Sequence, residues 1–189
     1  MSAVAAACRG DKNKMNQIAT RDRGRGHPAY DISGLNILIL EKQSLMQSLM
    51  KQVFRTFRVS KLNITDDPHE AYQSLLHAPA DIILCDWSHD LDGLEFLRLV
   101  RNDDNSPNPF VPVVMVTAHS ERHHVMKARD AGMTEFLAKP VSANTIYGRL
   151  CAVIDSTRAF VRTHSFFGPD RRRRSVPFDG GDRRGFVAT

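Results

Sequence analysis

The 189-residue sequence contains few cysteines, namely Cys8, Cys85 and Cys151. Their number is odd and no two of them form a C-x-x-C spacing, so we expect neither a disulfide framework nor a cysteine-based zinc site. Cys85 falls in an apolar run and Cys151 in a helical pattern, where a small buried hydrophobic residue is the simpler interpretation. This cysteine usage is typical of a reducing compartment.

Long hydrophobic runs are also missing. No segment approaches the ~20 apolar residues that a membrane-spanning helix needs. The short apolar run at residues 3–7 lacks the basic residues that precede the core of a signal peptide. We therefore expect a cytoplasmic protein without a membrane span.

The centre of the chain lacks the positive charge that the whole sequence carries. The formal net charge is +5, yet residues 35–155 sum to −3, whereas residues 1–34 sum to +3 and residues 156–189 to +5. The basic character thus belongs to the two ends, and sequence-specific DNA binding by the central domain is not predicted.

From Leu35 onward, short apolar runs alternate with helical patterns, which predicts an α/β domain with a parallel sheet and helices on both faces. The predicted strands are 35–40, 60–64, 81–85, 112–117 and 134–138. The predicted helices are 43–57, one from Asp67, one from Gly93, one from Ser120 to Gly132, and one from Ser142 to about Phe160.

Both ends differ in composition from this domain. Residues 1–33 are polar with Arg-Gly repeats, and residues 161–189 are rich in glycine, proline and arginine. Such segments bury too little apolar surface to fold alone. We therefore predict a disordered N-terminal extension at 1–33, the α/β domain at 34–160 and an Arg-rich extended tail at 161–189.

Three polar residues stand at the ends of successive predicted strands. Asp86 follows Ile82–Cys85, Thr117 follows Val113–Val116, and Lys139 follows Phe136–Ala138. Because ligands of open α/β sheets bind at the carboxyl ends of the strands, these side chains should converge. A carboxylate, a hydroxyl and an ammonium together suit an aspartate that accepts a phosphoryl group.

These residues resemble the receiver domain of bacterial two-component response regulators, of the single-domain chemotaxis type. The resemblance rests on Leu84-Cys85-Asp86-Trp87 with Asp92-Gly93, on the strand that ends at Thr117-Ala118, and on Phe136-Leu137-Ala138-Lys139-Pro140. It covers about residues 35–155. It implies a flavodoxin-like (βα)5 doubly wound fold, whose five parallel strands are ordered 2-1-3-4-5.

The resemblance also implies roles for individual residues. Asp86 would be the phospho-acceptor, Thr117 the switch hydroxyl, Lys139 the phosphate-contacting lysine and Phe136 the aromatic that swings between two positions. Phe136 could equally be plain core. A histidine kinase or phosphotransfer protein would supply the phosphoryl group, and the face built from roughly 119–160 would contact an unidentified downstream protein.

The expected Mg²⁺ site departs from the family pattern. Glu41, Asp86 and the carbonyl of Ser88 would form it, but Lys42 replaces a second acidic residue, and the loop from Asp86 to Gly93 is one residue short. Both departures weaken metal-assisted phosphotransfer. Lys42 either lies at the surface with its ammonium in water or reaches Asp86 and substitutes for the metal's charge.

Other histidines and the tail allow further interpretations. His119, His123 and His124 suggest a metal site, but 123 and 124 should point to different sides of a helix, so exposed histidines are favoured. The tail is either a solvated polybasic extension or a guanine-binding segment, since arginine pairs with guanine edges. The arginine and aspartate residues concerned are Asp170, Arg171, Arg172, Arg173, Arg174, Asp182, Arg183 and Arg184.

Two functions follow from these patterns. The first is a single-domain response regulator, a switch rather than an enzyme, phosphorylated at Asp86. The second is a degenerate, phosphorylation-independent receiver that acts as a binding module through its Arg-rich tail. That arrangement is similar to receiver-like proteins whose Arg-rich tails bind cyclic di-GMP.

Overall fold

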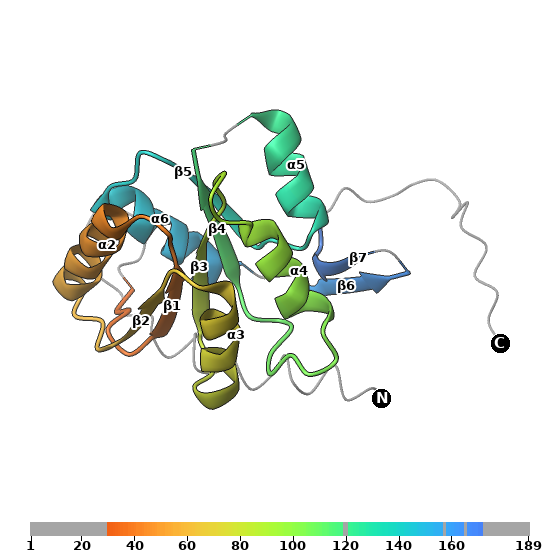
Figure 1. Ribbon diagram of the computed structural model, residues 1–189, viewed down its shortest axis with the longest axis horizontal. Helices are drawn as coiled ribbons and strands as arrows, with labels where there is room; N and C mark the ends of the chain where they lie inside the picture. The colour runs from red at the N-terminus through yellow and green to blue at the C-terminus, as the bar shows by residue number, and fades with distance from the viewer. Residues whose placement is uncertain (1–29, 119–120, 157, 165, 172–189) are drawn as a thin grey trace.

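A computed structural model describes residues 30–118, 121–156, 158–164 and 166–171 of the chain. Its main sheet has five strands in the order β2-β1-β3-β4-β5, all parallel (Figure 1). This confirms the predicted flavodoxin-like topology. The strands are β1 (Asn36–Leu40), β2 (Lys61–Thr65), β3 (Ile82–Asp86), β4 (Val113–Thr117) and β5 (Glu135–Ala138).

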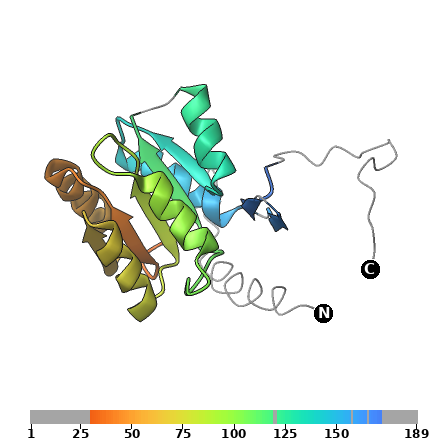
Figure 2. The ribbon, with the colours of Figure 1, turned by 45° about the vertical axis from the view of Figure 1, so that its right-hand side comes forward.

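Helices cover both faces of the sheet (Figures 1 and 2). They are α2 (Ser44–Thr56), α3 (Pro68–His77), α4 (Gly93–Asn102), α5 (Arg122–Asp130) and α6 (Ala143–Ile154). Residues of α3, α4 and α5 share one hydrophobic cluster, and residues of α2 and α6 share the other. None of the described helices is long and apolar enough to cross a membrane.

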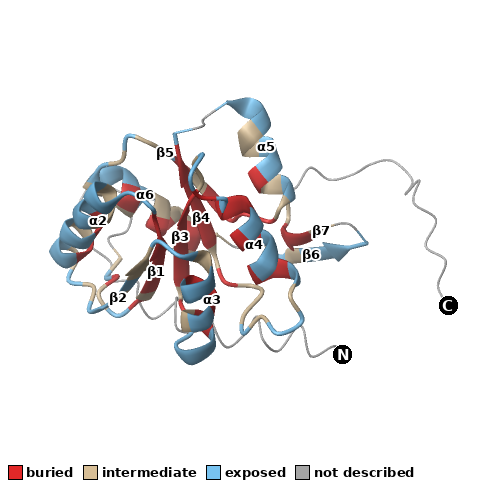
Figure 3. Ribbon diagram, viewed as in Figure 1, coloured by how far each residue is buried: buried red, intermediate tan, exposed pale blue. Residues whose placement is uncertain are grey.

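The central strands are apolar on both sides, as expected when helices cover both faces of a parallel sheet. In β3, Ile83 and Cys85 face the α3–α4 side, whereas Ile82 and Leu84 face the α2–α6 side. All five residues of β3 and of β4 are buried, as Figure 3 shows for the middle of the sheet. Asp86 and Thr117 therefore end strands that have little freedom to move.

Side chains fix the starts of several helices. Asp67 accepts hydrogen bonds from the backbone N–H groups of His69 and Glu70, which confirms it as the N-cap of α3. The sequence Asp67-Pro68-His69-Glu70 also suggests a capping box, but the carboxylate of Glu70 accepts instead from the hydroxyl of Thr65. Ser142 caps α6 and exchanges hydrogen bonds with Thr145.

The end of the chain differs from the prediction. The last helix ends at Ile154 rather than near Phe160. The prediction of an extended tail from residue 161 is wrong for the first part of that segment. Instead, β6 (Phe160–Thr163) and β7 (Phe166–Pro169) form an antiparallel hairpin. The prediction from composition was wrong because it relied on the many arginines of this segment and overlooked three apolar residues, Phe160, Phe166 and Phe167.

The hairpin packs beside α4 and the end of α5 (Figure 1). The rings of Phe160 and Phe167 lie 5.3 and 5.1 Å from that of Phe110, each edge to face. Gly132, which has a φ of +97° at the end of α5, contacts the hairpin so closely that a Cβ there would lie 2.5 Å from the Phe167 carbonyl oxygen. Only glycine fits this junction.

Arg101 is enclosed beneath the hairpin and is 1% exposed. Its Nε donates to the Gly132 carbonyl at 3.0 Å, its Nη1 donates to the Pro109 carbonyl at 2.9 Å, and its guanidinium lies 5.3 Å from the Phe160 ring centre. Burial lowers the pKa of Arg101 to about 9, which leaves it charged at neutral pH. The hairpin is thus part of the folded domain, and the domain extends past the predicted boundary at residue 160.

Replacement of Gly168 by alanine tests this packing. A Cβ at Gly168 would lie 2.6 Å from the Gly132 Cα, so the hairpin must move away from the domain. We expect Gly168→Ala to lower the free energy of unfolding by about 1–3 kcal/mol in urea denaturation.

The matched control is Gly148→Ala on α6, where a Cβ meets nothing within 4 Å. Because alanine is the better helix former, this control should gain about 0.5–1 kcal/mol. A Gly168→Ala variant as stable as the wild type would contradict the described packing.

Candidate functional site

Four polar side chains meet at the carboxyl edge of the sheet. Glu41 directly follows β1, Asp86 ends β3, Thr117 ends β4 and Lys139 directly follows β5. The parallel register pairs Leu40 with Cys85, Asp86 with Val116 and Thr117 with Ala138. Glu41 and Asp86 therefore lie at the same level, Thr117 lies one residue beyond them and Lys139 two residues beyond them, all at the same edge. The predicted convergence of Asp86, Thr117 and Lys139 on one edge agrees with this placement.

Lys139 joins the two carboxylates of the site. Its Nζ lies 2.8 Å from Oδ1 of Asp86 and 2.8 Å from Oε2 of Glu41. The side chains of Glu41 and Asp86 are 2% and 1% exposed, and that of Lys139 is 13% exposed. One ammonium therefore pairs with two buried carboxylates that have almost no access to water.

The surroundings of Lys139 act on its pKa in opposite directions. Burial disfavours the charged ammonium, but hydrogen bonds and charge attraction from Asp86 and Glu41 outweigh burial, so the pKa of Lys139 is raised above its ordinary value of 10.5. A raised pKa in a lysine means that the ion pairs persist at neutral pH and are lost only as the pH rises through the folded-state pKa.

Backbone and side-chain contacts fix Glu41 in this position. Its Oε1 accepts from the backbone N–H of Gln43 at 3.0 Å, and its backbone carbonyl accepts from the side chain of Gln47 at 2.8 Å. Its backbone N–H donates to the carbonyl of Thr65 at 3.0 Å. The contributions of Gln43 and Gln47 could not be identified from sequence, because neither belongs to a strand-end pattern.

Gly93 controls the approach of α4 to the acceptor strand. A Cβ at this position would lie 2.0 Å from the backbone oxygen of Asp86 and 2.7 Å from Sγ of Cys85. No other residue fits without moving the strand that carries Asp86. Asp92, the N-cap of α4, accepts from the N–H groups of Leu94 and Glu95 and so fixes the start of this helix.

Thr117 is completely buried, and its hydroxyl donates to the backbone carbonyl of Trp87, the residue after Asp86. The hydroxyl of Thr117 thus contacts the loop that begins after Asp86. Phe136 is half-buried and packs against the hydrophobic cluster on the α3–α4 side of the sheet. This position agrees with Phe136 being a core residue, and the movement of its ring between two positions stays a prediction.

Lys42 lies at the surface, which favours the first of the two interpretations of this residue. It is exposed, whereas the ammonium that contacts Asp86 belongs to Lys139. The cation beside the Asp86 carboxylate is Lys139 and not Lys42, so the second of the two open interpretations of Lys42 does not hold.

The expected Mg²⁺ donors are present in part. Oδ2 of Asp86 is buried without a hydrogen-bond partner among the described residues, and Glu41 offers a second carboxylate. Ser88 lies in the loop that follows, where its carbonyl accepts a long bond of 3.4 Å from the N–H of Leu91. One or two carboxylates supplemented by other oxygen donors are typical of Mg²⁺ sites, so this set fits the ion.

The tail residues fall into two groups. The backbone N–H of Asp170 donates to the carbonyl of Ala159 at 2.8 Å. The guanidinium of Arg171 stacks 3.9 Å from the ring centre of Phe166 and pairs with Asp130 at 3.2 Å. The remaining predicted tail residues lie outside the described residues: Arg172, Arg173, Arg174, Asp182, Arg183 and Arg184.

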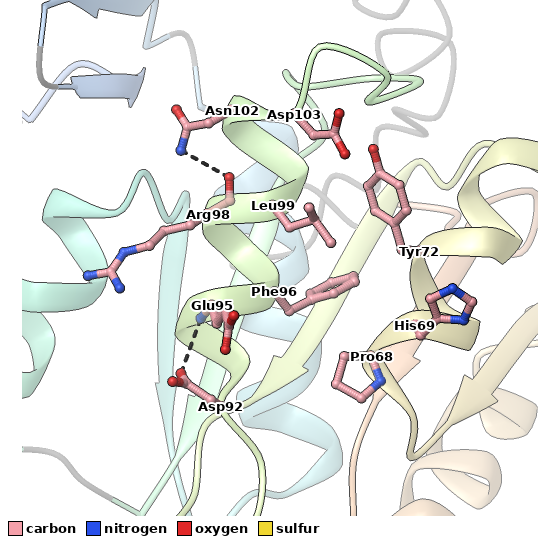
Figure 4. A pocket seen from close by; sticks show the side chains of 10 residues that line it. All are labelled: Pro68, His69, Tyr72, Asp92, Glu95, Phe96, Arg98, Leu99, Asn102 and Asp103. Carbon is pink, nitrogen blue, oxygen red and sulfur yellow. Dashed lines mark hydrogen bonds between the residues drawn. The ribbon is translucent and has the colours of Figure 1, made fainter.

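A groove with a volume of about 710 Å³ lies between α3 and α4, away from the convergent set (Figure 4). Figure 4 shows side chains of both helices turned toward it. Its lining includes none of Glu41, Asp86, Thr117 and Lys139, and the chemistry of the site does not involve it. The lining residues are Pro68, His69, Tyr72, Asp92, Glu95, Phe96, Arg98, Leu99, Asn102 and Asp103.

Known proteins share this sequence pattern and fold. The model of the response regulator receiver domain matches residues 37–150. The chemotaxis protein CheY-3 of Vibrio cholerae is 26% identical over 122 residues, which cover 64% of this chain and 92% of that protein. The chemotaxis protein CheY of Pseudomonas aeruginosa is 29% identical over 113 residues, which cover 59% of this chain and 90% of that protein.

Solved structures show the same fold. A structure of Vibrio cholerae CheY4 matches with a TM-score of 0.57 and 21% identity, covering 63% of this chain and 98% of that one. The receiver domain of the histidine kinase CKI1 from Arabidopsis thaliana, complexed with Mg²⁺ and BeF₃⁻, matches with a TM-score of 0.58 and 20% identity, covering 67% and 95%.

A doubly wound α/β fold with an aspartate, a threonine and a lysine at one sheet edge defines a receiver-type signalling domain. The match over residues 37–150 makes the assignment specific: the chain belongs to the response regulator receiver domain family. It is similar to CheY chemotaxis proteins, and the β6–β7 hairpin lies outside the residues that the family model matches.

The two ion pairs of Lys139 predict its titration. In the wild type, the Cε resonance of Lys139 followed by NMR should titrate above pH 10.5, because both carboxylates favour the ammonium. In Asp86→Asn the midpoint should move down, since one of the two partners has lost its charge. The exposed Asp90 provides the control: Asp90→Asn should leave the midpoint unchanged. A midpoint that does not respond to Asp86→Asn would contradict the described geometry.

Proposed function

We propose that the protein is a single-domain response regulator that accepts a phosphoryl group at Asp86. The observation that carries this proposal is the buried Asp86 carboxylate, with one oxygen 2.8 Å from the Lys139 ammonium and the other without a hydrogen-bond partner among the described residues. An ordinary structural aspartate at this depth would have both oxygens satisfied. The oxygen without a partner leaves this carboxylate open to a metal ion or to a reacting phosphoryl group.

The phosphoryl donor would be a histidine kinase or a phosphotransfer protein. An Asp86 oxygen attacks the phosphorus of the donor's phosphohistidine, the P–N bond breaks, and the imidazole that leaves takes up a proton. The product is an acyl phosphate on Asp86. Lys139 is close enough to neutralise the added charge, and Thr117, once released from the Trp87 carbonyl, can donate its hydroxyl to a phosphoryl oxygen.

Glu41, Asp86 and the Ser88 carbonyl would hold Mg²⁺, which when bound offsets the repulsion between the carboxylate and the incoming phosphoryl group. Lys42 weakens this site because it adds a positive charge where the family has a carboxylate. Lys139 supplies a cation to Asp86 in the described state, and this contact orients the carboxylate before any phosphoryl donor arrives.

The signal would reach a downstream protein through the face formed by α5, β5 and α6. Thr117 ends the strand next to β5, and Phe136 lies within β5, so movement of the Thr117 hydroxyl toward a phosphoryl group frees space near this face. In this role the protein is a switch and not a metabolic enzyme, and it needs no DNA-binding output domain.

The alternative, a binding module for cyclic di-GMP based on the arginine tail, receives less support. Arg171 already stacks on Phe166 and pairs with Asp130, so its guanidinium is engaged by the domain itself. A truncation that tests the tail alone must keep the chain up to Arg171, because removal of the β6–β7 hairpin would expose the buried Arg101 and disturb the domain itself.

Phosphorylation by a small phosphodonor tests the proposal. Full-length protein incubated with acetyl phosphate and Mg²⁺ should gain the mass of one phosphoryl group, measured by intact-protein mass spectrometry. Asp86→Asn should remove this gain, whereas the exposed Asp90→Asn in the same loop should keep it. A mass gain that persists in Asp86→Asn, or its absence from both the wild type and Lys42→Asp, would refute phospho-acceptance at Asp86.

Lys42→Asp should strengthen Mg²⁺ binding, because it replaces a positive charge by an oxygen ligand of the kind that Mg²⁺ prefers. Trp87 is the only tryptophan and directly follows Asp86, so its fluorescence reports on the site. We expect the concentration of Mg²⁺ at half-saturation to fall by about tenfold or more, equivalent to about 1.4 kcal/mol.

The matched control is Lys51→Asp, which makes the same change in net charge at an exposed position on α2. If both variants change the Mg²⁺ titration equally, the effect is one of overall charge, and Lys42 has no specific influence on the metal site.

A further inference from the structure

Three side chains that can bind metals lie together at the start of α5. They are Glu121, His123 and His124, and among the described residues they form a group whose ligand atoms all lie within 4.8 Å of one another. The expectation that His123 and His124 point to different sides of a helix is wrong, because their ring centres are only 3.9 Å apart.

The start of the helix explains why these side chains meet. Glu121 precedes α5 in an extended conformation with φ −63° and ψ 144°, and its side chain does not cap the helix. Its carboxylate therefore remains free to fold back over the first turn, where it meets both imidazoles. Successive residues of an α-helix are about 100° apart around its axis and not on opposite sides, so the side chains of His123 and His124 can turn toward each other.

The distances suit one small ion. Oε2 of Glu121 lies 2.9 Å from Nδ1 of His124 and 3.8 Å from Nε2 of His123. Two ligand atoms that each lie about 2.0–2.1 Å from a tetrahedral ion are about 3.3 Å apart. The observed values fall on either side of this separation, so small rotations of the side chains bring the three atoms to bonding distance.

We propose that Glu121, His123 and His124 bind a divalent transition-metal ion such as Zn²⁺ or Ni²⁺. Imidazole nitrogen selects these ions over Mg²⁺, which prefers oxygen ligands. Three protein ligands leave further coordination positions for water. The side chains of His123 and Glu121 are 61% and 66% exposed, so an ion can reach them directly from solvent.

This site is separate from the carboxylate pocket but is linked to it through one residue. The ring of Trp87 contacts that of His124 edge to face at 5.2 Å, and Trp87 directly follows Asp86. An ion at His124 therefore lies close to the chain's only tryptophan. Binding at this site does not depend on whether Asp86 is phosphorylated.

Quenching of Trp87 fluorescence by Ni²⁺ tests the proposal in the full-length protein. Because Ni²⁺ quenches only nearby fluorophores, ions bound to distant histidines contribute little, and His89→Ala removes the exposed histidine that lies two positions after Trp87 as a further control. We expect saturable quenching with one ion per chain, reversed by excess Zn²⁺. Glu121→Gln and His123→Ala should each raise the half-saturating Ni²⁺ concentration by about tenfold or more.

The matched control is His77→Ala, which removes an exposed histidine at the end of α3 and should leave the titration unchanged. Circular dichroism checks that the variants remain folded, which the exposure of Glu121 and His123 favours. Equal quenching in the wild type, Glu121→Gln and His123→Ala would overturn the site, as would the absence of saturable quenching in the wild type.

Discussion

The ion pairs of Lys139 hold the functional edge of this domain together. One ammonium contacts carboxylates that follow or end β1 and β3, while the lysine itself follows β5. Three strands of the sheet are thereby connected at the level where a ligand would bind. Two buried carboxylates side by side would repel each other, and removal of the lysine would leave that repulsion uncompensated. The geometry of Asp86 therefore depends on a residue that lies 53 positions later in the chain.

The strand-end residues were predictable because the physics that places them is simple. Apolar runs such as Ile82–Cys85 have only one stable arrangement in an α/β domain, in which helices cover both faces and the polar residues that follow meet at one edge. The lysine that contacts Asp86 was less predictable. Two lysines, Lys42 and Lys139, were candidates for contact with Asp86, and only side-chain reach in three dimensions decides between them.

The hairpin could not be predicted from its composition. Its arginines suggested a solvated tail, yet Arg171 covers Phe166 and Arg162 lies 4.2 Å from the ring centre of Phe167. Arginine side chains stack on aromatic rings while their charge remains near water, so a basic segment can still bury apolar surface. The side chain of Arg101 is enclosed by residues that are far apart in the sequence, such as Pro109, Gly132 and Phe160, so no local sequence pattern predicts its burial.

The departures from the family pattern are concentrated around the acceptor. Lys42 stands where an acidic residue is expected, and His124, which lies in one cluster with Glu121 and His123, contacts the ring of Trp87. Lys42 is exposed, and the cation that contacts the Asp86 carboxylate is Lys139. We propose that this arrangement keeps the site organised and lowers its affinity for Mg²⁺.

Urea denaturation of a double-mutant set tests most directly whether Lys139 supports two buried carboxylates. Lys139→Met alone should lower the free energy of unfolding by about 3 kcal/mol at neutral pH, because it leaves both carboxylates unpaired. The double variant Lys139→Met/Asp86→Asn should be more stable than Lys139→Met, since one of the two charges is gone. If the second substitution instead destabilises Lys139→Met further, the carboxylates do not share Lys139, and the account of the site is wrong.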